Sequence, residues 1–460
     1  MSAGRDGSPS RPFAVGDPNL IWFNGWLGEP ALPNAHATYP VSGLPLSRSP
    51  CHRVPLPTCP LAAILAAMST PSGSTPLPER LVSLDAFRGL TMLFMASSGF
   101  GIAQIADTHP DSGFWELLRY NTSHAAWIGG GAWDMIQPSF MFMVGMALPF
   151  SSSRRTAEGQ DQRKLFLHTL WRAFVLVALG VFLTTGTGTQ PVFGFHNVLA
   201  QIGLGYVFLT LLVGRGWKVQ LGAIGVIAVA TWAAFALTPI AGPTTDYKAL
   251  GVNDPGQILG GFWAHWNMNA NFAAHFDQWF LNLFPRETPF VFDKGGYQTL
   301  NFVPALITMT LGLMAGENLR SEKTSGEKLR WLIKAGALCL ILALATGTTI
   351  CPVIKKLWTP SWAFYSGAVV LWVFALFYWF IDIKGRKAWT FPLVVVGMNS
   401  IAIYLAYQLT KGWIIAIGRT WLGSGLFDGT YGALASSLLV LAVLWTFCWW
   451  LWKRKVFIRI

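Results

Sequence analysis

Charge is scarce in this sequence. Only 12% of its 460 residues are Asp, Glu, Lys or Arg, whereas a soluble domain usually carries about 25%. Hydrophobic residues make up 53% of the chain, including 23 Trp and 32 Phe. So few charges cannot cover the water-exposed surface of a chain this long, so lipid must solvate much of it. The composition excludes an ordinary soluble protein and predicts an integral, multi-pass membrane protein.

Familiar site motifs are missing as well. The five Cys are scattered without a Cys-x-x-Cys spacing, and the chain has no His-Glu-x-x-His, P-loop or Gly-x-Gly-x-x-Gly signature in a suitable context. The net charge of +12 comes from short basic runs between apolar stretches, as the positive-inside rule describes. It does not come from a basic helix of the nucleic-acid-binding kind. We therefore expect no metal and no nucleic-acid partner.

Apolar segments of membrane-spanning length recur along most of the chain. They predict an all-α fold, a polytopic transmembrane helix bundle with about ten spanning helices. A weaker apolar run, Trp413 to Ile417, is predicted to lie at the membrane interface. The ten segments lie near residues 87–106, 132–150, 167–187, 195–214, 218–238, 298–317, 331–350, 361–381, 389–410 and 431–452.

The first 79 residues differ from the rest. They are rich in Pro, Ser and Gly and lack apolar periodicity, which predicts a disordered N-terminal extension. The apolar patch Leu61–Ala67 resembles a signal-peptide core, but prolines interrupt the residues before it. Our hypothesis is that Met68 is the true start. The transmembrane domain is then predicted over residues 80–460.

Lys and Arg are distributed unevenly between the connections. One alternate set (154–164, 215–218, 320–330, 384–387 and the tail 453–459) holds 17 of them, and the other set holds eight, including Lys355 and Lys356. The positive-inside rule then predicts that both termini are cytoplasmic. Residues 107–131 and 239–297 are expected outside the cytoplasm, where an aqueous acceptor would meet the protein.

The most informative stretch, Ser123 to Gly145, joins a His, a Trp and a Gly-rich turn to the start of a spanning helix. His124 is predicted at the outer membrane boundary. There an imidazole can take a proton from an attacking amine or hydroxyl, or can accept an acyl group itself. Asp134 can orient the ring. The alternative is structural: His124 binds a loop carbonyl, and Asp134 caps the helix.

A second pair, Asp85 and Arg88, lies at the cytoplasmic start of the first predicted span. Their spacing of three suits an ion pair within one helix turn, and Asp85 is placed to satisfy free amides at the helix start. Arg88 can alternatively hold a phosphate of a cytoplasmic ligand.

Further polar and aromatic residues are candidates for binding substrate or coenzyme A. Most of them lie at predicted helix ends or at membrane depth, where unpaired polar groups are expensive. Hydrogen bonding between helices is the alternative explanation for those at membrane depth. The candidates are Trp127, His196, Asn197, Gln201, Asn271, Asp277, Asn399 and Ser400.

Several of these motifs resemble one known family. Ser83–Leu90, followed by His-Ala-Ala-Trp-Ile-Gly at 124–129 and Asp134, is similar to the transmembrane heparan-alpha-glucosaminide N-acetyltransferases and their bacterial relatives. The resemblance spans roughly residues 79–460, and the order and spacing of its short motifs carry it. The later motifs are residues 197–201, 271–277, 304–316, 357–361, 381–385, 397–401 and 453–460.

This resemblance implies transfer of an acetyl group from cytoplasmic acetyl-CoA, a co-substrate, to a glucosamine amine on the far side of the membrane. The essential histidine of the family falls on His124. An acyl-His intermediate and direct attack in a ternary complex both stay open. The resemblance also implies membrane lipid as the surroundings, a bacterial inner (cytoplasmic) membrane as the location, and a homodimer as one expected assembly.

The chain also departs from the family pattern. Gly99 stands where family members commonly carry Asn, and Ser97 or Ser98 is a candidate replacement. The large luminal domain of the animal enzyme is missing, so a cell-envelope amino sugar is the expected acceptor. Two alternatives remain: a transporter or flippase for a small or lipid-linked solute, and a catalytically inactive relative. The scarcity of charge at the centres of the predicted spans disfavours an ion-coupled transporter.

Overall fold

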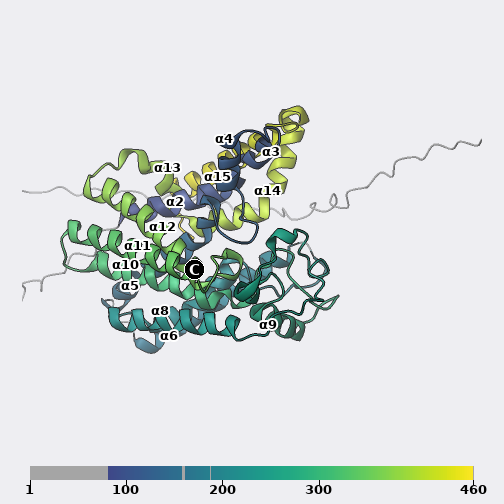
Figure 1. Cartoon of the computed structure of the whole chain (residues 1–460). Coiled ribbons are helices and arrows are strands. Elements are labelled where there is room, and N and C mark those ends of the chain that lie inside the picture. The colour runs from purple at the N-terminus through teal and green to yellow at the C-terminus, as the bar shows by residue number, and fades with distance from the viewer. Residues whose placement is uncertain (1–80, 158–160, 187, 459–460) are drawn as a thin grey trace, which may run out of the picture. The chain divides into compact units, whose positions relative to one another are not determined.

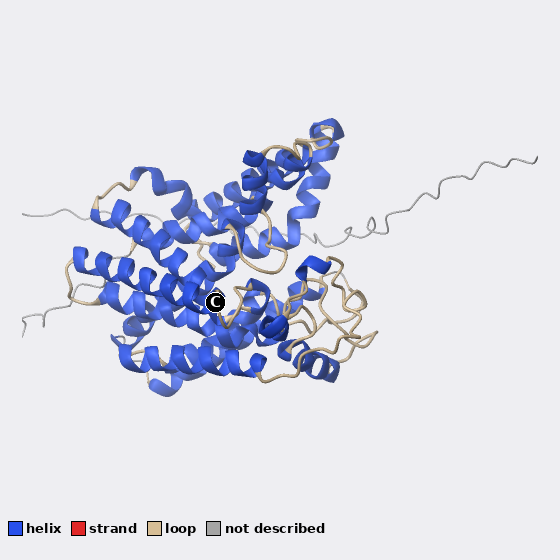
Figure 2. Cartoon of the chain, in the orientation of Figure 1, coloured by secondary structure: helices blue, strands red, loops and turns tan. Residues whose placement is uncertain are grey.

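The computed structural model describes residues 81–157, 161–186 and 188–458, and these residues contain helices and loops but no β-strand. The prediction of an all-α, polytopic helix bundle is confirmed. The predicted extension 1–79 and the proposed start at Met68 lie outside the described residues. Figures 1 and 2 show how the helices are arranged.

The helices vary in length from six to 24 residues. The longer ones form the bundle, and the shorter ones lie in the connections. In chain order, they are α2 (Val82–Ala96), α3 (Ile102–Asp107), α4 (Gly113–Thr122), α5 (Ile136–Ala157), α6 (Gln162–Thr185), α7 (Val198–Leu211), α8 (Trp217–Ala236), α9 (Phe272–Phe280), α10 (Phe302–Arg320), α11 (Ser325–Gly347), α12 (Pro360–Phe377), α13 (Phe391–Gly397), α14 (Ser400–Leu422) and α15 (Gly432–Lys453).

Seven helices in the described part of the chain are long and apolar enough to cross a membrane: α6, α8, α10, α11, α12, α14 and α15. An eighth span results if α2 and its continuation to Asp107, bent by 41°, are taken as one. The 14 residues of α7 reach about 21 Å, which is less than the roughly 30 Å of a hydrocarbon core. The count of ten spans and the cytoplasmic location of both termini therefore stay predictions.

The predicted span at 389–410 is wrong in its boundaries, because two helices occupy it. α13 ends at Gly397 and α14 begins at Ser400. Asn399 lies in the break, where its side chain donates to Val456 O and accepts from the Ile458 amide. The helix is interrupted at Asn399, and the side chain of this residue holds the C-terminal tail against the bundle. The apolar run expected at the interface belongs to α14, which continues to Leu422.

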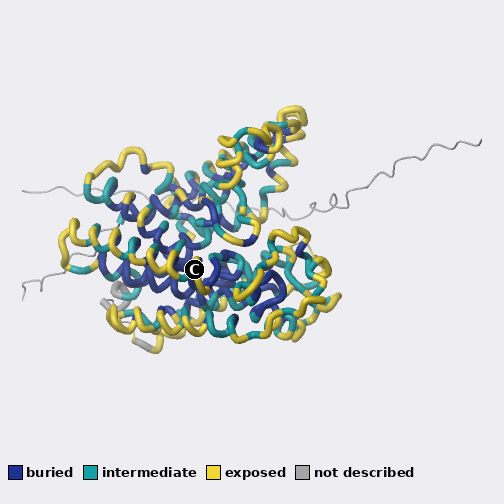
Figure 3. Tube along the Cα trace, in the orientation of Figure 1, coloured by how far each residue is buried: buried dark blue, intermediate teal, exposed yellow. Residues whose placement is uncertain are grey.

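Helix α10 lies at the centre of the bundle and packs against α5, α7, α8 and α12 (Figure 3). Small residues allow its close approach to α5. A Cβ on Gly145 would lie 1.9 Å from Met309 O, and one on Gly312 would lie 2.0 Å from Phe142 O, so only glycine fits at either position. This packing fixes the starts of α5 and α12, and the candidate site lies just before both helices.

The long connection between α8 and α10, which contains α9, lies at one end of the bundle, whereas α3 and α4 lie apart from α9 and beside α15 (Figures 1 and 2). The Gly129 amide donates to Val353 O at 2.8 Å, joining the segment before α5 to the segment before α12. Trp127 Nε1 donates to Trp266 O at 3.1 Å, which ties in the long connection between α8 and α10. These two hydrogen bonds join the segments before α5 and α12 and the long connection between α8 and α10. The side of the membrane on which this end lies remains a prediction.

Candidate functional site

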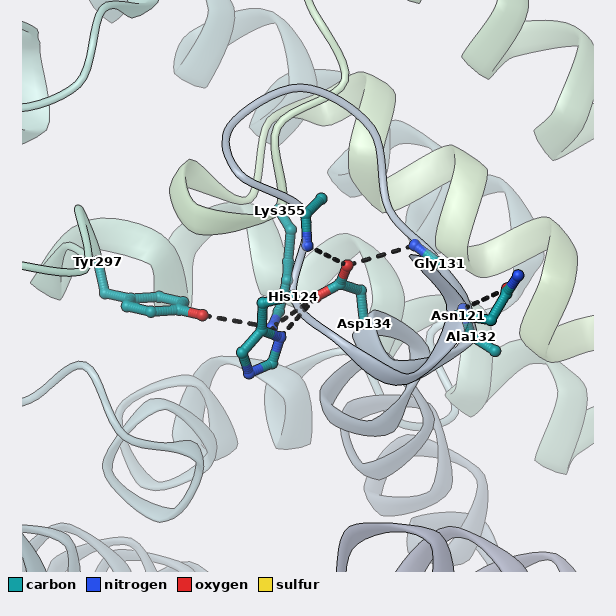
Figure 4. Close-up of polar contacts among 8 residues, drawn as sticks. Asn121, His124, Gly131, Ala132, Asp134, Tyr297 and Lys355 are labelled. Carbon is teal, nitrogen blue, oxygen red and sulfur yellow. Dashed lines mark hydrogen bonds and ion pairs between the residues drawn. The ribbon is translucent and has the colours of Figure 1, made fainter. Parts of the chain in front are cut away.

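His124 and Asp134 form the centre of the candidate site (Figure 4). His124 directly follows Ser123, the C-cap residue of α4, and Asp134 lies in the short 3-10 helix η2 (Ala132–Met135) before α5. The two side chains meet at 2.7 Å between His124 Nδ1 and Asp134 Oδ1. The imidazole side chain is 50% exposed, whereas the carboxylate is fully buried. The site therefore combines an accessible ring with an inaccessible anchor.

The carboxylate of Asp134 accepts from four donors. Its Oδ2 accepts from the backbone amides of Ala125 at 3.0 Å and Gly131 at 3.3 Å, which closes the loop from 124 to 134 around it. Its Oδ1 faces His124 and the amine of Lys355. Asp134 thus caps η2 and also holds the imidazole, so the structural and the functional readings of this residue describe the same geometry.

Lys355 also belongs to this cluster, although nothing in its local sequence assigned it a role in the site. It begins the 3-10 helix η7 (Lys355–Leu357), between α11 and α12, and is only 6% exposed. Its Nζ lies 3.0 Å from Asp134 Oδ1 and 2.9 Å from His124 Nδ1, and it donates to the Tyr297 hydroxyl at 3.3 Å. The sequence did carry one sign of this role: Lys355 and Lys356 are adjacent lysines in a connection that belongs to the set with few Lys and Arg.

The two donors around one carboxylate oxygen decide the state of the imidazole. With His124 Nδ1–H donating to Asp134, the neutral ring carries its lone pair on Nε2. The Nε2 atom has no hydrogen-bond partner among the described residues, and Figure 4 shows the rest of the ring pointing away from the carboxylate. In this tautomer the unprotonated nitrogen lies on the exposed side of the ring. A neutral ring that accepts from Lys355 Nζ at Nδ1 carries its proton on Nε2 instead.

Burial governs the electrostatics of the cluster. It lowers the pKa of Lys355, an effect that the charge of Asp134 partly opposes. Burial also raises the pKa of Asp134, but the hydrogen bond from His124 and the charge of Lys355 outweigh it, so that pKa lies below its ordinary value. For Tyr297, burial and the charge of Asp134 both raise the pKa. Asp134 is therefore a carboxylate and Tyr297 a neutral phenol at neutral pH.

The Gly-rich turn, which the sequence suggested for close approach by a ligand, is approached closely by the protein itself. A Cβ on Gly130 would lie 2.4 Å from the Trp362 ring, and one on Gly131 would lie 2.3 Å from Tyr120 O. Gly129 has a φ of 91°, which side chains rarely adopt. These glycines let the loop that carries His124 pack against α4 and α12.

Among the other candidates, His196 is the one that reaches this cluster. Its ring stacks on Tyr297 with 6.4 Å between centroids. Trp127 is instead 2% exposed and packs in an apolar cluster. Asp85 and Arg88 form the expected ion pair at 3.7 Å, at the start of α2.

The remaining polar candidates bond mainly to the backbone. Asn197 and Asn271 are the N-caps of α7 and α9, where they accept from the Ala200 and Ala274 amides. Gln201 is fully buried and donates to carbonyls of two loops. Asp277 accepts from the Thr299 amide, and Asn399 binds the C-terminal tail. Ser400 is the first residue of α14. A role for these residues in substrate binding stays a prediction.

Gly99 has a steric reason in this chain. It lies in a short left-handed turn, Ser98–Gly101, with a φ of 68°, and a Cβ there would come within 2.6 Å of Thr122 O. Thr122 is the last residue of α4, two positions before His124, so Asn could not occupy position 99 without moving the start of the site loop. The Ser98 hydroxyl lies 2.7 Å from the Tyr407 hydroxyl, and Ser97 donates to Phe94 O.

An apolar groove of about 210 Å³ lies between α2, α5 and α12. On α2 it extends from Phe87, the neighbour of Arg88, to Phe94. Phe94 contacts the Trp133 ring edge-on at 5.1 Å, and the Trp133 ring lies 6.3 Å from that of His124. The groove therefore lies along α2, and Phe94 in its lining contacts the Trp133 ring beside the site.

Comparison with known proteins supports the resemblance seen in the motifs. Residues 80–256 match the family model described as heparan-alpha-glucosaminide N-acetyltransferase, catalytic. The Homo sapiens protein of that name is 24% identical over 384 residues, which cover 73% of this chain and 54% of the relative. The Mus musculus protein is 23% identical over 405 residues, covering 76% and 58%. The chain spans little more than half the length of these relatives. The resemblance is confirmed.

Proposed function

We propose that this chain, a membrane-embedded relative of the heparan-alpha-glucosaminide N-acetyltransferases, is an acyltransferase. It would move an acetyl group from cytoplasmic acetyl-CoA to an amino sugar of a glycan on the opposite side of a bacterial cytoplasmic membrane. The observation that carries the proposal is the half-exposed imidazole of His124, held through Nδ1 by the buried carboxylate of Asp134. The names of the relatives supply the acyl group and the class of acceptor.

The chemistry needs an unprotonated Nε2. In direct transfer, the amine nitrogen attacks the thioester carbonyl, the C–S bond breaks, the coenzyme A thiolate leaves, and His124 Nε2 takes the amine proton. In the two-step route, Nε2 itself attacks the carbonyl and the thiolate leaves. The amine then attacks the acyl-imidazole and displaces Nε2, which takes up the amine proton as it leaves. Both routes use the nitrogen that faces away from Asp134, and Asp134 stabilises positive charge on the ring.

The groove along α2 supports entry of the acyl donor from the end where Arg88 lies. A guanidinium is suited to hold a phosphate. The apolar lining from Phe87 to Phe94 suits an uncharged part of the acyl donor rather than a charged, hydrated group. The loops around His196 and Tyr297 lie at the other end of the bundle, where a sugar acceptor would arrive from water. Donor and acceptor would thus meet at His124 from two sides.

The test is an assay with purified protein, radiolabelled acetyl-CoA and a panel of amino sugars. Wild type should yield labelled acetylated sugar, and His124→Ala should lower the rate by about 1,000-fold, because one group supplies the base or the nucleophile. His275→Ala is the matched control. It removes an exposed histidine from α9, at the same end of the bundle, and should keep wild-type turnover.

Two outcomes contradict the proposal in different ways. Unchanged turnover in His124→Ala removes His124 from the mechanism. Absence of labelled product with every acceptor removes the acyltransferase itself. If the protein then moves an amino sugar across a vesicle membrane without acetylating it, the transporter alternative is favoured.

A further inference from the structure

One carboxylate oxygen serves two possible cations in the candidate site. Asp134 Oδ1 lies 2.7 Å from His124 Nδ1 and 3.0 Å from Lys355 Nζ, and the two nitrogens are 2.9 Å apart. The carboxylate is fully buried, and the lysine side chain is 7% exposed. An unpaired charge is expensive in such surroundings, so the number of protons on this cluster is constrained.

Counting charges shows which state is favoured. A protonated Lys355 and an ionised Asp134 form a neutral buried pair, and a neutral His124 leaves it so. Protonating His124 as well puts a second cation 2.9 Å from the first, with one carboxylate between them. Lys355 Nζ is the buried partner of Asp134, whereas the His124 ring is half exposed, so a cation on Lys355 completes the buried pair and a second cation on the ring would be repelled by it.

We propose that Lys355 is a positioning residue that keeps the imidazole of His124 uncharged and so available for reaction. The proposal rests on the proposed function for its purpose, because an imidazolium can neither take a proton nor accept an acyl group. Its physical content, the effect of one buried ammonium on the charge of one imidazole, does not depend on which reaction the protein carries out.

The surroundings hold the ammonium in place. The Tyr297 hydroxyl accepts from Lys355 Nζ at 3.3 Å, and the Tyr297 ring stacks on His196. Lys356 projects over the Trp127 ring with 5.9 Å between Nζ and the centroid. The titratable and charged groups around the imidazole, from every segment packed against it, are Asp134, Lys355, Tyr297, Lys356, Asp293 and His196.

The sign of the effect follows from this arrangement. Lys355→Met removes the competing cation and leaves Asp134 to pair with His124 alone, which favours the imidazolium. The ring then loses its proton only at higher pH. A charge at this separation shifts a titration by at least about one unit, so reactions of the neutral imidazole should move to higher pH by that amount. On the acid side of the midpoint, they should slow by about tenfold.

Diethyl pyrocarbonate reads the state of the ring without any acyl donor or sugar, because it modifies the neutral imidazole. Purified full-length protein would be treated between pH 5 and pH 8, and the rate of modification at His124 would be measured by peptide mass spectrometry. Lys355→Met should raise the midpoint of the rate profile by about one pH unit. Lys355→Arg keeps the charge and should stay close to wild type.

Lys356→Met is the matched control, because it removes a neighbouring ammonium that has no contact with Asp134 or His124 among the described residues. It should shift the midpoint by less than half as much. If Lys355→Met fails to fold, Asp134→Asn gives the complementary test. Removing the anion while keeping the lysine should lower the midpoint.

The results separate this proposal from the proposed function. A midpoint that Lys355→Met leaves at the wild-type value, or that Lys356→Met shifts equally, overturns the role of Lys355. A raised midpoint in a protein that acetylates none of the sugars supports the role of Lys355 and counts against the acyltransferase. Where turnover is present, the acid limb of its pH profile should shift in the same direction and by the same amount.

Discussion

Two buried aspartates, Asp134 and Asp277, lie in regions that differ in almost every other respect. Both are 2% exposed or less. Asp134 has two backbone amides, a histidine and a lysine around its carboxylate. Asp277, in α9, accepts from the Thr299 amide through Oδ2, and its Oδ1 has no partner among the described residues. Burial is the same, but the supply of donors is not.

The difference in donors gives the two carboxyl groups opposite properties. The pKa of Asp134 is lowered, whereas burial raises the pKa of Asp277 to about 6. An ionised carboxylate beside an accessible imidazole can hold a tautomer and stabilise a cation. A carboxyl that titrates near pH 6 beside a backbone amide makes folding of its own loop depend on pH. The first arrangement suits chemistry, and the second suits structure.

The same substitution at both positions tests this contrast. Asp134→Asn should have the largest effect, with acetyl transfer lowered by about 100-fold or more, because the imidazole loses the group that fixes its tautomer. It should also lower the free energy of unfolding by about 3 kcal/mol, since it leaves the buried ammonium of Lys355 without its counter-ion. The measurements are turnover with labelled acetyl-CoA and thermal unfolding in detergent. Wild-type turnover in this variant would show that Asp134 is only a helix cap.

Asp277→Asn should behave in the opposite way. The raised pKa means that the folded state binds the proton more tightly than the unfolded state. Stability from this group is therefore present below about pH 4 and lost as pH rises through about 6. Above that window, the ionised carboxylate costs at most about 3 kcal/mol. The neutral Asn keeps the acceptor for the Thr299 amide and avoids that cost.

The expected result is a thermal midpoint for Asp277→Asn that equals the wild-type value near pH 4 and exceeds it by several degrees at pH 7.5. A variant that unfolds earlier than wild type at pH 7.5 would mean that the Asp277 carboxylate has a partner that stabilises its charge.

The contrast also shows how far sequence reasoning reaches. His124 and Asp134 are ten residues apart in one loop, so their pairing could be predicted from spacing and from the chemistry of the two side chains. Asn197, Asn271 and Asn399 looked like ligand-binding groups because they are polar residues in an apolar chain. The first two are N-caps and the third binds the tail. The preference of Asn for helix starts gave the better explanation for the N-caps.

Lys355 could not be found in the same way, because it lies 231 residues from His124 in the chain. Its place in the site depends on the packing of α5 and α12 against α10 and on the hydrogen bond between Gly129 and Val353. No local periodicity records contacts of that range. Charge counting gave the end of the bundle on which Lys355 lies, and tertiary packing gave its partner.

Tyr297→Phe should have the smallest effect. It tests how much the second hydrogen bond of Lys355 contributes beside its ion pair with Asp134. The change removes the hydroxyl that accepts from Lys355 Nζ but keeps the ring that stacks on His196. One hydrogen bond from a charged donor is lost while the bond to Asp134 remains, so turnover should fall by about fivefold, equivalent to roughly 1 kcal/mol. Tyr247→Phe is the matched control, because its hydroxyl accepts from Asn267 instead, and its turnover should not change. If Tyr297→Phe loses as much activity as Asp134→Asn, the phenol itself must touch the reacting groups, and the division between a carboxylate that holds the imidazole and a hydroxyl that only holds the lysine is wrong.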